Sequence, residues 1–73
     1  MFWIEVRDSI SGTFQNVLRH RPEVGFKYKL RPAYHTKNLA KVDARKVVLA
    51  FPEWVDIRVN SPKGIPYTVK RGV

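Results

Sequence analysis

Three stretches of this chain alternate apolar and polar residues with a period of two, and this pattern constrains the fold more than any other feature. They span residues 2–8, 24–31 and 54–60. Side chains of a strand point alternately to the two faces of a sheet, so such stretches predict half-buried β-strands. In the most regular stretch, Val24, Phe26, Tyr28 and Leu30 alternate with Gly25, Lys27, Lys29 and Arg31. One face of this expected strand is apolar, and the other is cationic after its first position.

Turn-forming residues predict two further short strands. Residues 8–12 read Asp-Ser-Ile-Ser-Gly, which favours a turn, so we expect residues 2–19 to form a β-hairpin. Residues 61–64, Ser-Pro-Lys-Gly, favour a second turn. A last strand is expected over residues 66–70, and its leading Pro66 places it at an edge of the sheet.

One helix is expected before Pro52, which prevents the helix from continuing. Its apolar stripe consists of Ala40, Ala44, Val47, Val48 and Phe51. Thr36 would cap a long version of this helix and Asp43 a short one, and the pattern does not choose between them.

The predicted fold is a single α+β domain over residues 1–73 with the element order β-β-β-α-β-β. One helix packed on one face of a mostly antiparallel sheet would bury every apolar stripe, and a small β-barrel plugged by the helix is the alternative. The expected core consists of Phe2, Ile4, Val6, Phe14, Phe26, Tyr28, Leu30, Ala44, Val47, Val48, Phe51, Val55, Ile57 and Val59.

The chain has 73 residues, no cysteine and two histidines, so no disulfide and no structural zinc site is expected to stabilise this core. In a domain of this size, burial barely exceeds the conformational entropy of folding, about 1.5 kcal/mol per ordered residue. Efficient packing or support from a partner is therefore required.

Residues suited to catalysis are few and dispersed. His20 and His35 lie in expected loops with no cysteine nearby, and the six acidic residues form no pair at strand or helix spacing. Glycine-rich phosphate loops and hydrolase motifs are absent. We therefore expect no enzymatic activity, no catalytic residue, no metal and no cofactor.

Positive charge is concentrated in the middle of the chain. Residues 19–46 hold nine of the 14 basic and two of the six acidic residues, a net +7 out of +8. This clustering of one sign favours a polyanionic partner, and the alternative is a solvated face that keeps a small domain soluble. Lys27, Lys29 and Arg31 would stand about 6.6–7 Å apart along one strand face, close to the spacing of phosphates on a nucleic-acid strand. The other basic candidates are Arg19, Arg21, Lys37, Lys41 and Arg45.

Three aromatic residues are candidates for base stacking or for an interface anchor. Trp3 and Trp54 fall on the polar side of their expected strands, and Tyr34 lies in the loop after Arg31. The alternative for each is an ordinary place at the edge of the core or in a loop.

The pattern as a whole predicts a small non-enzymatic binding module that contacts the phosphates of RNA or DNA without strong sequence selection. The alternatives are an interaction subunit that docks on an acidic surface of a virion, ribosome or other nucleoprotein assembly, and a small inhibitor of a partner protein. Glu5 interrupts the apolar start of the chain, so neither a signal peptide nor a transmembrane helix is expected there. A cytoplasmic location is the default expectation.

Overall fold

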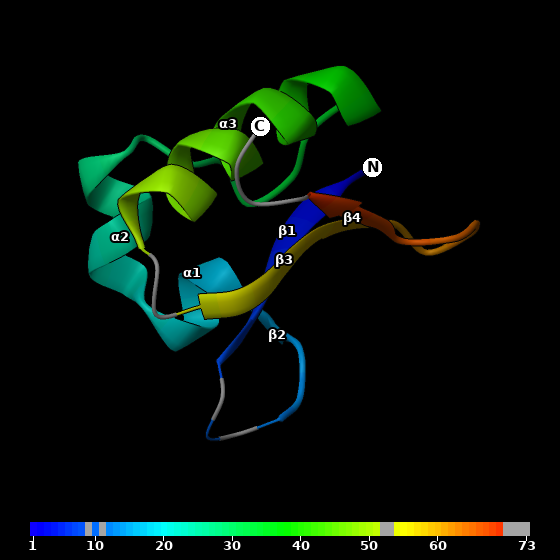
Figure 1. Cartoon of the computed structure of the whole chain (residues 1–73). Coiled ribbons are helices and arrows are strands. Elements are labelled where there is room, and N and C mark those ends of the chain that lie inside the picture. Colours follow the sequence, from blue (N-terminus) through cyan, green and yellow to red (C-terminus); the bar gives the residue numbers. More distant parts are fainter. Residues whose placement is uncertain (9, 11, 52–53, 70–73) are drawn as a thin grey trace.

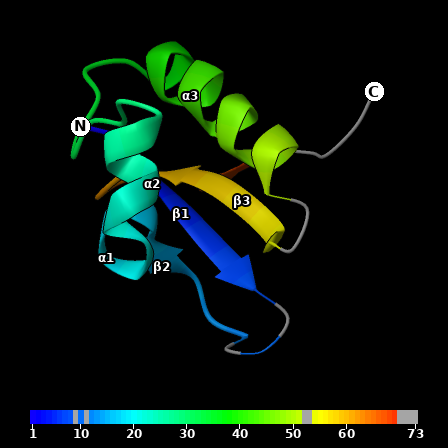
Figure 2. The same cartoon turned by 90° about the vertical axis from the view of Figure 1, so that its left-hand side faces the viewer.

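In the described part of the chain, a four-stranded antiparallel sheet carries three helices on one face (Figures 1 and 2). The computed structural model describes residues 1–8, 10, 12–51 and 54–69. The elements are β1 (Trp3–Asp8), β2 (Gln15–Asn16), α1 (Val17–His20), α2 (Pro22–Lys27), α3 (Lys37–Ala50), β3 (Trp54–Asn60) and β4 (Tyr67–Val69). The strand order is β2-β1-β3-β4, so the sheet is open, and the chain does not adopt the closed alternative. The predicted α+β class, with an antiparallel sheet and a helix packed on it, is confirmed.

The central pair of strands supplies the floor of the core. Ile4 pairs with Val59 and Val6 with Ile57, and all four side chains are buried against the helices. Alternation sends the intervening side chains to the opposite face, as the period-two pattern of both strands predicts. We call this helix-free side of the sheet the open face.

The long version of the predicted helix is correct. The Thr36 hydroxyl accepts a hydrogen bond of 3.2 Å from the backbone N–H of Leu39, and α3 then continues to Ala50. Its buried residues are Ala40, Ala44, Val47 and Val48. Two alanines on this face let the helix axis approach the sheet closely.

The strand predicted over residues 24–31 is wrong, because this segment begins with helix α2. Pro22 occupies the start of the helix, where its fixed φ is favourable and no N–H is needed. The helix ends in a Schellman motif: the N–H of Leu30 donates to the carbonyl of Gly25 at 2.8 Å, and Lys29 has a left-handed φ of 55°.

The same segment shows why an alternating pattern can mislead. Residues four apart share a helix face, so Val24 is buried and Tyr28 packs against the core. Residues two apart point in nearly opposite directions, so Phe26 is 91% exposed. The prediction that Phe26 belongs to the core is therefore wrong.

Other parts of the predicted core also change. Phe14 lies beside arginines of the open face, with its ring centroid 3.8 Å from the Arg58 guanidinium, and the Val55 side chain lies outside the described part. Phe2, Tyr28 and Phe51 are half-buried at the margin of the core. The core residues that the sequence did not identify are Val17, Val24, Tyr34, Ala40 and Val69.

The predicted hairpin is only partly correct. Glu5 of β1 does pair with Asn16 of β2, but β2 has two residues. The Asn16 side chain then accepts a hydrogen bond of 3.0 Å from the N–H of Leu18 and caps α1. A cap in this position ends the strand and starts a helix, where residues 17–19 were expected to remain extended.

Candidate nucleic-acid interface

The predicted row of three cations along a strand does not exist, because its residues lie on a helix end and the turn after it. Lys27 is the last residue of α2, Lys29 has the left-handed backbone of the Schellman motif, and Arg31 follows the buried Leu30. The regular strand spacing is therefore lost. All three side chains remain on exposed residues.

Two of these cations meet a third in one hollow beside α3. Lys29 and Arg31 line it from the turn, and Lys46 lines it from α3. We call this the cationic hollow; its volume is about 310 Å³. Its other lining residues are Tyr28, Tyr34, Leu39, Val42 and Asp43.

Tyr34 holds the two sides of the cationic hollow together. Its hydroxyl donates a hydrogen bond of 2.7 Å to Asp43 Oδ2 of α3 and accepts one of 3.0 Å from the backbone N–H of Arg31. Its backbone forms two hydrogen bonds with Phe2, at 2.7 and 2.9 Å. Because the residue is only 1% exposed, its ring is closed to a nucleobase, and the stacking role suggested by the sequence is wrong.

Burial raises the pKa of Tyr34 to about 12, and the neighbouring Asp43 carboxylate adds to this effect. The phenol therefore stays protonated at neutral pH and keeps its donor role. Asp43 is the one acidic residue among those that line the cationic hollow, and it is already engaged by Tyr34 and, at 3.5 Å, by Lys46 Nζ. Within the described residues, neither Lys29 nor Arg31 has an ion-pair partner.

The predicted cations of α3 lie apart from the cationic hollow. Lys37 and Lys41 place their ammonium groups 5.0 and 4.0 Å from the centroid of the Tyr67 ring on β4. These are cation–π contacts with an edge strand. Arg45 is exposed on the same helix and is absent from the lining of the cationic hollow.

Arg19 and Arg21 also lie elsewhere. Arg19 lines a polar hollow of about 470 Å³ with Phe14 and residues of β1 and β2, and Arg21 lies between α1 and α2. The structure thus divides the predicted basic residues among several surfaces. Lys29 and Arg31 meet at the cationic hollow, and Lys37 and Lys41 meet at the Tyr67 ring.

On the open face, charges are paired with one another. Glu5 accepts hydrogen bonds from Trp3 Nε1 at 2.9 Å and from Arg58 Nε at 2.6 Å, and Arg7 pairs with Asp56. Partial burial alone would raise the pKa of Glu5, but these hydrogen bonds, with one from Asn60, hold it below its usual value.

Of the two predicted tryptophans, the structure describes the side chain of Trp3 alone. Trp3 is half-buried on the open face and tied to Glu5, while the Trp54 side chain lies outside the described part of the chain. Among the described side chains, Arg7 and Arg58 of the open face are each paired with a carboxylate, whereas Lys29 and Arg31 at the cationic hollow are not.

Sequence reasoning did not select Lys46, although a signal for it was present. Leu39, Val42 and Lys46 follow one another at helical spacing, and the first two are exposed although apolar. This spacing on the outer side of the helix is the signal from which Lys46 could have been selected.

The described residues offer neither a group of metal ligands nor a membrane-spanning helix. No three histidine, cysteine or acidic side chains are grouped to hold a metal ion there, and none of the described helices has the length and apolar character needed to cross a membrane. Comparisons with protein-family models, curated proteins and solved structures found no match to the chain.

Proposed function

We propose that the protein is a non-enzymatic module that binds the phosphate backbone of a nucleic acid through the cationic hollow. The observation that carries this proposal is the convergence of Lys29, Arg31 and Lys46 from two separate segments. Each cation that neutralises a phosphate releases condensed counterions, which favours binding and makes it depend on salt. Such contacts do not distinguish bases, so binding tolerates many sequences.

Apolar exposure beside the cations gives further support. Leu39 is 47% and Val42 56% exposed in the wall of the hollow. A wall of low polarity strengthens the attraction between cation and phosphate once water is displaced. A purely solvated face of a basic domain has no need of these side chains.

A triple substitution, Lys29→Ala, Arg31→Ala and Lys46→Ala, tests the proposal. With one phosphate per cation, the slope of log affinity against log salt should flatten by about 2.7 for a duplex and about 2 for a single strand. The matched control removes three charges elsewhere, Lys37→Ala, Lys41→Ala and Lys63→Ala, and should change the slope less.

Fluorescence anisotropy with labelled oligonucleotides at several salt concentrations measures these slopes, and circular dichroism checks that each variant folds. A folded triple variant with the wild-type slope would refute the proposal. So would an equal loss in the control, because charge alone and not its place would then determine binding.

A further inference from the structure

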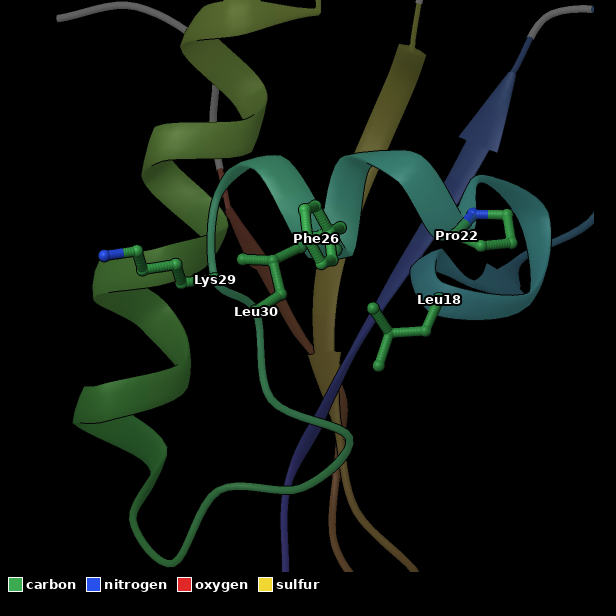
Figure 3. Close-up of a pocket in the computed structure, with 6 residues that line it drawn as sticks. Leu18, Pro22, Phe26, Lys29 and Leu30 are labelled. Carbon is green, nitrogen blue, oxygen red and sulfur yellow. The ribbon is translucent and has the colours of Figure 1, made fainter.

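Phe26 is the most exposed aromatic side chain of the described residues, at 91%, and it stands at a second hollow (Figure 3). We call this the apolar hollow; it is lined by Leu18, Pro22, Gly25, Phe26, Lys29 and Leu30 and has a volume of about 610 Å³. Phe26 contributes little to the core of the protein. An aromatic ring this exposed on a small domain indicates a surface that contacts a partner.

The apolar hollow adjoins the cationic hollow through one shared residue. Lys29 lines both of them, and in Figure 3 its side chain points from the turn toward α3 while the apolar side chains lie on the other side. Lys27 lies one residue beyond Phe26 and holds its ammonium group 5.8 Å from the centroid of the Tyr28 ring. A partner that fills the cationic hollow and continues past Lys29 therefore reaches the Phe26 ring.

We infer that the apolar hollow takes an unpaired nucleobase, stacked on Phe26, from a single strand whose phosphates occupy the cationic hollow. This inference rests on the proposed function and names its substrate class. Aromatic side chains next to a cationic groove bind single strands in this way, since every base offers a face for stacking. Paired bases inside a duplex offer no such face, so the site prefers a single strand.

The lining of the apolar hollow also predicts its selectivity. Lys29 is its one polar side chain, and a flexible ammonium group provides no fixed pattern of donors and acceptors for a base edge. Stacking without base-edge contacts favours any accessible base.

Binding of labelled oligothymidylate, of an abasic strand of equal length and of a blunt-ended duplex of two separate strands tests this inference. Phe26→Ala should weaken oligothymidylate binding by roughly 5- to 150-fold and leave the abasic strand and the duplex unchanged. Phe26→Trp should retain wild-type affinity because indole stacks. Phe26→Leu, which stays apolar but cannot stack, should behave as Phe26→Ala does.

The outcomes separate this inference from the proposed function. If the triple cation variant flattens the salt slope but Phe26→Ala binds oligothymidylate as wild type does, phosphate binding stands and the stacking site is refuted. Wild-type affinity in Phe26→Leu would also refute stacking and would indicate an apolar protein partner. Equal weakening on the abasic strand would show that Phe26 acts through the fold, and thermal unfolding of each variant reports that effect directly.

Discussion

The Tyr34 hydroxyl lies 2.7 Å from Asp43 Oδ2, and this hydrogen bond joins the turn that carries Lys29 and Arg31 to helix α3. Both partners are enclosed, because Tyr34 is buried and the Asp43 side chain is 18% exposed. The cationic hollow therefore has a buried, hydrogen-bonded base beneath exposed charged residues. Its shape depends on this contact more than on the cations themselves.

Tyr34→Phe should lower the free energy of unfolding by about 1–2 kcal/mol, because it removes a buried donor to Asp43 and an acceptor for the Arg31 N–H. Urea unfolding followed by circular dichroism measures the change. Tyr28→Phe is the control: it removes a hydroxyl from a half-buried ring at the same hollow and should change stability less. Equal losses in the two variants would contradict the role assigned to Tyr34.

Alkaline pH should destabilise the protein through the same phenol. Burial raises the pKa of Tyr34 to about 12 in the folded chain, against 10.0 for a free tyrosine. A raised pKa gives stability that is complete below the unfolded value and is lost as the pH rises from 10 toward 12. Tyr34→Phe should flatten this part of the stability profile, measured as the thermal midpoint against pH. If the alkaline stability profile of Tyr34→Phe equals that of the wild type, the loss of stability comes from groups other than Tyr34.

Acid pH should destabilise the protein by protonating Glu5. Its pKa in the folded chain lies below the usual 4.5, so the carboxylate adds stability that is present above that value and is lost as the pH falls through the folded pKa. Glu5→Gln should be less stable at neutral pH and should show a shallower decline in acid. Glu23→Gln, which removes the same charge from the exposed surface of α2, is the control for the change in net charge.

Core and surface substitutions should separate sharply in stability. Ile57→Ala removes a fully buried side chain and should cost about 2–5 kcal/mol, enough to unfold much of so small a domain. Phe26→Ala, although it deletes a larger group, should change stability by about 0.5 kcal/mol or less. Thermal unfolding compares the two variants. A large loss of stability in Phe26→Ala would show that Phe26 is buried and would contradict its exposed position on helix α2.

The sequence predicted secondary structure correctly where an alternating pattern was compatible with a strand only. The alternation of residues 2–8 and 54–60 is followed in each case by a strong turn signal, and strands occupy Trp3–Asp8 and Trp54–Asn60. Over residues 24–31, Val24 and Tyr28 satisfy a helix as well as a strand, and Pro22 favours the helix. The helix end carries Lys29 where glycine is usual, so the common signal for this ending was missing from the sequence.

For the candidate site, the sequence identified the charge but not its arrangement. Lys29 and Arg31 were selected for a row along a strand, and they are brought instead to Lys46 by the packing of a turn on α3. That contact depends on Tyr34, which is hydrogen-bonded to Asp43 and to Phe2, and Phe2 is distant in sequence. Periodicity reports local structure, so it could not reveal this juxtaposition.

The left-handed backbone of Lys29 places stability and binding in conflict at one position. Glycine adopts this conformation without the steric cost that a side chain brings, so Lys29→Gly relaxes the end of α2. The same change removes the one side chain that belongs to both hollows. Directed evolution for heat resistance alone would therefore favour glycine here and discard the proposed ligand contact, whereas selection for binding would keep lysine and accept a less stable domain.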